Sequence, residues 1–404
     1  MVTNVHKTMV MIIVFAGIAI AAMAEHGRIH ISQSKLTPGY TAMTPGSYIL
    51  TENLSFTGSF AAIVVGTNDV TIDLNGYTIY GGTNSQSAIF QDAGVSRTRI
   101  RNGTVAHFTR NSGFAVVLLG EGNVVQDIRF RNCRESLWLG SHARVTGVQI
   151  SGVNAFAGGG FGINAGNGAL IQDCRVSGMS FSTGYTGIVA GVSAIISGCS
   201  VVSNSANTFY GISAGAHSIV ESCMVNGNNG TNVFSGILVQ SNSVVNSVTA
   251  SQNIQGFLGY GVQLFNHGII AGSKADRNSS FGIVGGAGSM LVDNVASSNG
   301  LIGISITSDG FAMRNHVTWN GQAAPGSGGG MVVSGSGNRI EENSAHFNVA
   351  GILINGTGNL VVGNLASGNS TNNILVTQTN NHVGFRRTVN SAFSDWNTFG
   401  NIQQ

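Results

Sequence analysis

The sequence has few charged residues and few prolines, and both shortages limit the fold classes that the chain can adopt. Only 8% of the 404 residues are Asp, Glu, Lys or Arg, and only 3 are proline, whereas 59 are glycine. A glycine-rich disordered chain would carry more proline or charge and fewer Val and Ile. A helical protein would use far more Ala, Leu, Glu and Lys. Short alternations of Val and Ile with Ser, Thr, Asn and Gly instead indicate an all-β chain.

Long apolar runs are absent except at the N-terminus. His6 and Lys7 precede an apolar run from Met9 to Ala22, which ends in the small-x-small sequence Ala22-Met23-Ala24. This pattern is typical of a secretory signal peptide over residues 1–24, cleaved near Ala24. The run is too short for a comfortable membrane span. We therefore expect a mature chain that begins near Glu25 and is secreted, extracellular or in the cell envelope, with no membrane span after cleavage.

A short pattern, a small residue followed by aliphatic-x-aliphatic, recurs at intervals of 21–27 residues. Its clearest copies start at Gly162, Gly187, Gly211, Gly236, Gly261, Gly282, Gly303, Gly330 and Gly351, with a frayed copy at Asn373. Weaker copies start upstream at Ala62, Ala88, Ala115 and Ser136. A fixed period of this length indicates a repeat architecture.

Two rows of asparagine follow the same period. The first row has one member per copy: Asn204, Asn228, Asn253, Asn278, Asn299, Asn320, Asn348 and Asn369. The second row lies five residues earlier in four copies: Asn294, Asn315, Asn343 and Asn364. Asparagine tolerates left-handed turns, and stacked amides can hydrogen-bond from one copy to the next. The two rows predict corners that repeat along a stack.

The stretch TIDLNGYTIYGG, residues 71–82, tests this interpretation. Asn75-Gly76 between two alternating runs is a strong hairpin signal, and Asp73 with Asn75 also resembles half a calcium loop. A hairpin requires antiparallel pairing that the rest of the chain does not support. A calcium loop requires further oxygen ligands that are absent after Gly76. We therefore predict a corner, with Ile72, Leu74 and Ile79 pointing inward.

A unit of this length with three short strands is one coil of a parallel β-helix. The chain resembles the secreted right-handed parallel β-helix repeat proteins of the pectin-lyase-like superfamily, in their uncharacterised bacterial type, over roughly residues 47–385. The resemblance implies an all-β, single-stranded solenoid of about 13–14 coils with short terminal caps. We expect an N-terminal cap and first strands over 25–60, the β-helix over 61–385, and a tail or cap over 386–404. Phe393, Trp396 and Phe399 could fold back over the last coils.

The same resemblance implies that polysaccharide would lie on the outer face of the aliphatic-x-aliphatic strand. The third residue of each copy then faces out: Phe90, Val117, Trp138, Asn164, Val189, Ser213, Leu238, Gln263, Val284, Ser305, Val332, Leu353 and Leu375. None is charged, whereas lyases need calcium-binding carboxylates and a base, and glycoside hydrolases need two carboxylates. The motifs that carry activity in those families are also absent. This row therefore favours a protein without catalytic activity.

Two carboxylates remain as weak catalytic candidates. Asp127 and Asp173 occupy nearly equivalent corner positions two coils apart, roughly 10 Å at the usual strand spacing. That distance is the outer limit for an inverting pair. The alternative is that each carboxylate caps a turn, as asparagine does elsewhere.

Basic residues are concentrated between Arg97 and Arg144. We expect Arg101, Arg129 and Arg175 to lie just after the corner and to form a basic stripe near Trp138. These four residues are the candidate ligand-binding set, and Arg129 is also a weak catalytic candidate. The stripe could bind an acidic polysaccharide. The alternative, which we favour, is a solvated face partly neutralised by its own carboxylates. It is too short for nucleic acid.

Aromatic residues precede six of the copies and could stack on sugars or close a buried corner: Phe161, Tyr185, Tyr210, Phe234, Tyr260 and Phe281. Cys174, Cys199 and Cys223 share one position in three consecutive coils, while Cys133 substitutes in the first asparagine row. One bridge between neighbouring coils is possible, but no disulfide framework is indicated. We expect no metal site and no cofactor.

Three functional hypotheses follow from these patterns. The leading one is a secreted or cell-surface β-helix protein without catalytic activity that binds polysaccharide or other surface partners. The second is a polysaccharide lyase or glycoside hydrolase with an atypical site. The third is a structural, adhesin-like shaft. The ligand and the oligomeric state are not encoded in any pattern that we recognise.

Overall fold

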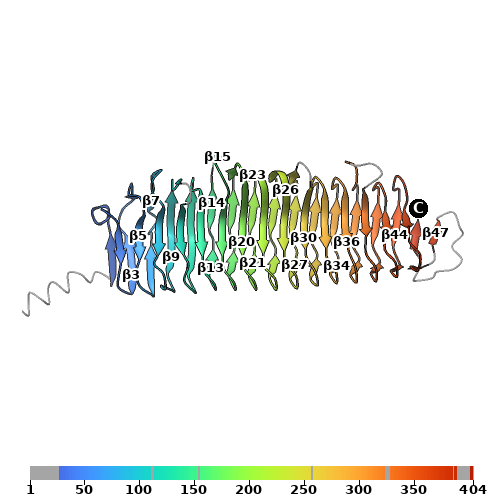
Figure 1. Cartoon of the computed structure of the whole chain (residues 1–404), viewed down its shortest axis with the longest axis horizontal. Helices are drawn as coiled ribbons and strands as arrows, with labels where there is room; N and C mark the ends of the chain where they lie inside the picture. Colours follow the sequence, from blue (N-terminus) through green and yellow to red (C-terminus); the bar gives the residue numbers. More distant parts are fainter. Residues whose placement is uncertain are drawn as a thin grey trace, which may run out of the picture.

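A computed structural model describes residues 27–110, 113–152, 155–255, 258–323, 328–384, 386–388 and 401–403. The expected signal peptide and the aromatic residues Phe393, Trp396 and Phe399 lie outside this part. The chain forms a rod in which each stretch of sequence stacks on the one before it, from the blue to the red end in Figure 1. It is a right-handed parallel β-helix of about 13 turns, as predicted. One short helix, η1 (Gln33–Lys35), lies near the N-terminal end.

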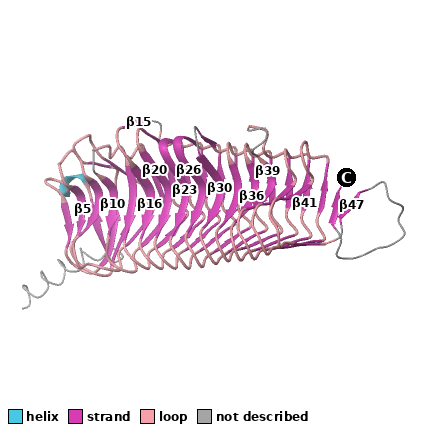
Figure 2. Ribbon diagram, turned by 45° about the vertical axis from the view of Figure 1, so that its right-hand side comes forward, coloured by secondary structure: helices cyan, strands magenta, loops and turns pink. Residues whose placement is uncertain are grey.

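The long strand of each coil belongs to one sheet, the long-strand sheet. Its strands correspond to the aliphatic-x-aliphatic copies, and neighbours pair in parallel (Figure 2). They are β2 (Tyr40–Ala42), β5 (Ala61–Val65), β8 (Ser87–Gln91), β10 (Phe114–Leu118), β12 (Glu135–Leu139), β16 (Gly160–Ala165), β20 (Gly184–Ala190), β23 (Ser205–Ala214), β26 (Asn229–Val239), β30 (Leu258–Leu264), β33 (Phe281–Gly285), β36 (Ile302–Ile306), β39 (Gly329–Val333), β42 (Ile352–Ile354) and β45 (Ile374–Val376). Three shorter strands pair in the same sheet: β15 (Ala155–Phe156), β19 (Ser180–Phe181) and β29 (Ile254–Gln255).

Two further strands follow in each coil, and they stack into a first and a second short-strand ladder. The first ladder contains β1 (Arg28–Ile31), β3 (Gly46–Leu50), β6 (Val70–Asp73), β13 (Arg144–Thr146), β17 (Leu170–Gln172), β21 (Ile195–Ser197), β24 (Ile219–Glu221), β27 (Val244–Asn246), β31 (Ile269–Ala271), β34 (Met290–Val292), β37 (Phe311–Met313), β40 (Arg339–Glu341), β43 (Leu360–Val362) and β46 (His382–Val383). The second ladder contains β4 (Leu54–Ser55), β7 (Thr78–Tyr80), β14 (Gln149–Ser151), β18 (Arg175–Ser177), β22 (Ser200–Val202), β25 (Met224–Asn226), β28 (Thr249–Ser251), β32 (Lys274–Asp276), β35 (Val295–Ser297), β38 (His316–Thr318), β41 (Ser344–His346), β44 (Leu365–Ser367) and β48 (Asn401–Gln403), which also pairs with β47 (Arg386–Thr388). β9 (Arg99–Ala106) and β11 (Val124–Arg131) run through both ladders.

Asn75-Gly76 is a corner, as predicted. Asn75 has φ 51° and Gly76 has φ 80°, and they separate β6 from β7. Both strands pair in parallel with β9 of the next coil. Ile72, Leu74 and Ile79 are fully buried.

The core consists of aliphatic side chains stacked in columns, one residue per coil. The column from the long-strand sheet is fully buried over nine coils: Ile163, Ile188, Ile212, Ile237, Val262, Ile283, Ile304, Met331 and Ile352. Such burial of aliphatic side chains is the main favourable term in folding. Because a coil cannot bury its inner face alone, every coil depends on its two neighbours.

The first asparagine row is a continuous hydrogen-bonded ladder. Each Nδ2 donates to the Oδ1 of the next member at 3.0–3.1 Å, from Asn204 to Asn369. The second row behaves in the same way from Asn294 to Asn364 at 2.9–3.0 Å. A third row, which we did not predict, joins Asn338, Asn359 and Asn381 at the corner that follows the long strand.

The ladder also explains the glycine that opens each copy. A Cβ added at Gly261, Gly282 or Gly303 would lie 2.6 Å from the Nδ2 of Asn278, Asn299 or Asn320 respectively. The amide of one corner therefore occupies the space that a side chain would need at the start of the long strand. The recurring glycine and the asparagine row therefore have the same cause, the close contact between the asparagine amide and the start of the long strand.

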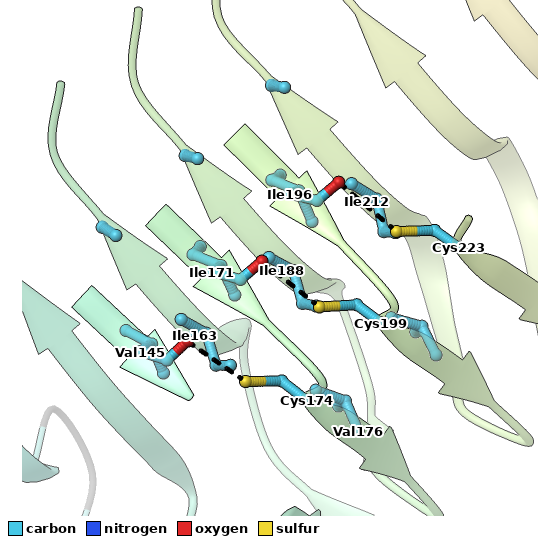
Figure 3. Close-up of a cluster of buried hydrophobic side chains, with 14 of the residues drawn as sticks. Val145, Ile163, Ile171, Cys174, Val176, Ile188, Ile196, Cys199, Ile212 and Cys223 are labelled. Carbon is cyan, nitrogen blue, oxygen red and sulfur yellow. Dashed lines mark hydrogen bonds between the residues drawn. The ribbon is translucent and has the colours of Figure 1, made fainter. Parts of the chain in front are cut away.

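The cysteines continue the second row toward the N-terminus. Cys174, Cys199 and Cys223 point the same way from successive coils, and their Sγ atoms contact backbone carbonyls of Val145, Ile171 and Ile196 (Figure 3). All four cysteines are buried and free. Burial raises the pKa of the Cys133 thiol to about 12, and the neighbouring thiols raise the pKa values of Cys199 and Cys223.

Replacing Asn299 with Ala will lower the free energy of unfolding by about 3 kcal/mol. The change removes the bonds that Asn299 donates to Ala275 and Asn320, and it leaves Asn278 without its acceptor. Urea unfolding followed by circular dichroism measures the difference. Asn84→Ala, at an exposed position, is the control and will change stability by less than about 0.5 kcal/mol. Equal effects of the two substitutions would contradict the role of the ladder.

The four thiols will resist labelling in the native protein, because they are buried. Denaturation in guanidinium without a reductant will expose four reactive thiols, which a chromogenic disulfide reagent can count. Two reactive thiols after unfolding would instead show a bridge between neighbouring coils.

Candidate functional site

A groove lies at the corner between the two short-strand ladders near the N-terminal end of the rod. Its volume is about 360 Å³, and it spans successive coils. Its lining is polar or glycine throughout: Gly76, Asn102, Gly103, Thr104, Asp127, Arg129, Gly147 and Gln149. Two of the sequence candidates, Asp127 and Arg129, lie here.

A glycine at the corner of the next coil leaves space for the carboxylate of Asp127. Asp127 has φ 51° and Gly147, the corner of the next coil, has φ 65°. A Cβ on Gly147 would lie 2.5 Å from Oδ1 of Asp127. Gln126 donates from Nε2 to the other oxygen of Asp127 at 3.1 Å. The carboxylate is exposed and held by its neighbour on the chain.

Arg129 brings an exposed cation to the same groove. In the register of the second ladder, Thr104 precedes Arg129, and Gln149 follows it. Within the described ranges, no ion pair or hydrogen bond engages its guanidinium. The groove therefore presents a free guanidinium flanked by a hydroxyl and an amide, which together can donate to carboxylate, hydroxyl or sulfate oxygens.

Asp173 and Arg175 repeat this arrangement two coils farther on. Arg175 follows Gln149 in the register, and Asp173 lies over Gly198 as Asp127 lies over Gly147. Neither residue lines the groove. The coil of Gly147 separates the two aspartates, so they stand in one line along the rod and do not face each other across a cleft.

The register corrects the prediction for Arg101. Arg101 aligns with Gln126, before the corner, whereas Arg129 aligns with Thr104, after it. The corner of that coil is Asn102, with φ 61°. Arg101 consequently lies one row away from Arg129 and Arg175, and its guanidinium contacts the buried carboxylate of Asp73 at 3.0 Å. The prediction that Arg101 lies in one stripe with Arg129 and Arg175 was therefore wrong.

Trp138 lies on another side of the rod. It belongs to β12 of the long-strand sheet, where its ring packs on Phe114 at 4.7 Å between centroids. Trp138 is 37% exposed, whereas Val117, its neighbour in the register, is buried. The structure does not bring Trp138 together with the arginines, because the long strand and the short ladders present different faces.

The predicted aromatic row divides into two columns. Tyr185 aligns with Phe209, and it is buried and stacked on Phe181. Tyr210 aligns with Thr186, one residue later in the strand. Tyr260 and Phe281 align with each other and stack at 5.2 Å. The expectation of one row was wrong because Tyr185 precedes its glycine by two residues instead of one; the side chain of Phe234 lies outside the description.

Glu135 is a functional candidate that the sequence did not single out. It is 7% exposed and lies at the start of β12, where burial raises the pKa of its carboxyl group to about 7. Arg134, also buried, lowers this pKa in part. Burial, and to a smaller extent Glu135, raises the pKa of the Tyr185 phenol. Perturbed carboxyl groups of this kind occur at functional sites and in structural clusters alike.

No cluster of three or more metal-ligating side chains occurs among the residues that the structure describes. In the same part of the chain, no helix is long and apolar enough to cross a membrane.

Comparison with known proteins shows a likeness of fold. No family model matches the chain, and no curated protein matches its sequence. Among solved structures, a variant of the periplasmic alginate epimerase AlgG is 13% identical, with 87% of this chain and 82% of that chain covered and a TM-score of 0.49. The A-module of a mannuronan C-5 epimerase from Azotobacter vinelandii is 12% identical, with coverage of 87% and 94% and a TM-score of 0.39.

An alpha-1,3-glucanase catalytic unit from Streptomyces thermodiastaticus is 9% identical, with coverage of 86% and 70% and a TM-score of 0.44. Likeness at this level concerns the path of the chain and not its chemistry.

Glu135→Gln will stabilise the protein above pH 7 and leave it nearly unchanged at pH 4.5. The folded-state pKa of about 7 exceeds the ordinary value of 4.5, so the native state binds more protons than the unfolded state between these values. The free energy of unfolding of the wild type therefore falls as pH rises through this window. Melting temperatures at pH 4.5, 6 and 8 measure the effect. Glu342→Gln, at an exposed carboxylate, is the control. A pH-independent gain for Glu135→Gln would contradict this account.

The chain has a right-handed parallel β-helix fold, with a polar groove at the corner between its two short-strand ladders.

Proposed function

We propose that the protein is a secreted or cell-surface β-helix that binds an acidic polysaccharide and does not cleave it. The observation that carries the proposal is the free guanidinium of Arg129 in a hollow lined by Thr104 and Gln149. Arg175 stands in the same outward row two coils farther along. Repeated donors at a fixed spacing suit a ligand that itself repeats.

The groove supports binding better than glycoside hydrolysis. Hydrolysis needs two carboxylates on opposite sides of the scissile bond. Asp127 is the only acidic residue in the lining, and Asp173 lies outside it. One carboxylate next to one guanidinium orients a sugar ring, but it does not provide the pair of groups that hydrolysis requires.

A polysaccharide lyase is the second candidate, because Asp127 and Arg129 line the same groove. A lyase removes a proton from the sugar ring with a basic residue, and Arg129 could occupy that position. The third reading, a structural shaft, needs no groove at all.

Arg129→Ala will weaken binding to an anionic polysaccharide roughly tenfold, because one charge-assisted hydrogen bond is lost. Affinity electrophoresis of residues 25–404 in gels cast with polygalacturonate measures retardation as a function of polymer concentration. Arg28→Ala, at an exposed arginine of β1, is the matched control and will migrate as the wild type does. Asp127→Asn removes a repulsive charge and will strengthen retardation a few-fold.

Staining the same gels for glycan separates the three readings. Retardation without clearing supports the binding protein. A cleared zone that disappears in the Asp127→Asn, Asp173→Asn double variant would replace it with the enzyme. A wild-type protein that no anionic gel retards would leave the shaft as the better description.

A further inference from the structure

Two large aromatic rings lie exposed near the C-terminal end of the second short-strand ladder. Trp319 follows β38 and Phe347 follows β41, on successive coils. Trp319 is 55% exposed and Phe347 is 49% exposed. Their rings stack at 5.0 Å between centroids, with 19° between the planes. At this distance and angle the two rings partly overlap, and we call this exposed stacked pair the aromatic platform.

The backbone at both residues is one that bulky side chains rarely adopt. Trp319 has φ 58° and Phe347 has φ 54°. The same corner elsewhere in the ladder carries Gly227 and Gly368, with φ 62° and 63°. Placing a large side chain in this region costs on the order of 1 kcal/mol per residue. Each ring nevertheless remains about half exposed, which directs attention to a role outside folding.

The next coil is shaped to receive the platform. A Cβ on Gly368 would lie 2.9 Å from the ring of Phe347. The absence of a side chain there leaves room for the Phe347 ring over the next coil.

A chain of hydrogen bonds runs beside the platform on the outer face of the same strands. His316 Nδ1 lies 3.3 Å from Ser344 Oγ, and Ser344 Oγ lies 2.6 Å from His346 Nε2. His346 Nδ1 then lies 2.6 Å from Oγ of Ser367 on the following coil. Burial, with the neighbouring His316, lowers the pKa of His346. These contacts fix the imidazole of His346 6.4 Å from the ring of Phe347.

Charge is largely compensated near the platform. Arg314, at the preceding corner of the Trp319 coil, donates to both oxygens of Asp293 at 2.8 and 3.0 Å. The platform therefore offers aromatic faces, hydroxyl groups and imidazoles without a free guanidinium such as that of Arg129. Aromatic rings stack on the apolar faces of sugar rings, while hydroxyl and imidazole groups exchange hydrogen bonds with sugar hydroxyls.

We propose that Trp319 and Phe347, with His316 and Ser344 beside them, form a second glycan subsite that holds an uncharged pyranose unit. The inference rests on the proposed function, since both assign glycan binding to the outer face of the second ladder. His316 and Arg129 stand in one outward row, separated by eight register steps, or roughly 38 Å at the usual strand spacing. A polysaccharide with charged and uncharged units could contact both ends of this face.

Trp319→Gly and Phe347→Gly test the proposal without disturbing the fold, because glycine occupies this corner in other coils. Each variant should melt no lower than the wild type and lose neutral-glycan binding at least tenfold. Trp319→Asn is the second variant, since asparagine also tolerates a positive φ. Phe265→Ala, which removes a 38%-exposed ring elsewhere on the rod, is the matched control and should bind as the wild type does.

The probes are xylan, glucomannan and soluble starch in affinity gels, with polygalacturonate alongside. Retardation by a neutral gel that both glycine variants lose, with Phe265→Ala unchanged, supports the subsite. Equal retardation of the wild type and both glycine variants would overturn it, as would a wild type that no neutral gel retards. In either of those cases, retardation by polygalacturonate and its loss in Arg129→Ala still decide the proposed function separately.

Discussion

The whole structure depends on one constraint, the register of the stack: each residue must lie directly over its equivalent in the next coil. The asparagine ladder makes that register specific. The amide of Asn278 donates to the amide oxygen of Asn299, and a shift of one residue along the chain would break this hydrogen bond. The same amides fill the space over Gly261 and Gly282, so a shift by one residue would place a side chain where an amide already lies. Aliphatic columns supply most of the favourable free energy, but a column of Val and Ile is similar at every step. The corners therefore decide the register that the core alone would leave ambiguous.

This architecture separates the inside of the rod from its outside. Inward positions repeat because each must fit the coil above and below, whereas outward positions are free to vary. Functional side chains can then line up along the rod at equivalent outward positions, as Arg129, Gln149 and Arg175 do. A ligand that repeats along its own length is the natural partner for such rows. The groove at Asp127 and the aromatic platform at Trp319 flank the outer face of the second ladder, the groove at the corner before its strands and the platform at the corner after them.

The sequence predicted the periodic part of the structure and missed most of what is not periodic. The coils, the corner at Asn75 and two asparagine rows followed from spacing alone. The position of Arg101 did not, because Asn102, and not the residue before Arg101, forms that corner. Tyr185 was assigned to the wrong column for a similar reason, since one extra residue before its glycine turns the ring inward.

Other features left no periodic signal to find. Three glycines on different coils, Gly76, Gly103 and Gly147, line the groove, so its shape depends on which side chains are absent. The raised pKa of Glu135 follows from burial, which a single carboxylate in a sequence does not reveal. Trp319 and Phe347 each precede an asparagine of the first row, at the position that adopts a positive φ. That offset was visible in the sequence, but only the known conformation of the corner gives it meaning.

The central claim is that glycan binds the outer face of the second short-strand ladder. Photo-crosslinking with a diazirine-bearing oligogalacturonide, followed by peptide mapping, tests this claim directly. We expect labelled peptides from β9, β11 and β14, which contain Thr104, Arg129 and Gln149. Labels confined to the long-strand sheet around Phe90 and Trp138 would contradict the account and assign binding to the opposite set of strands.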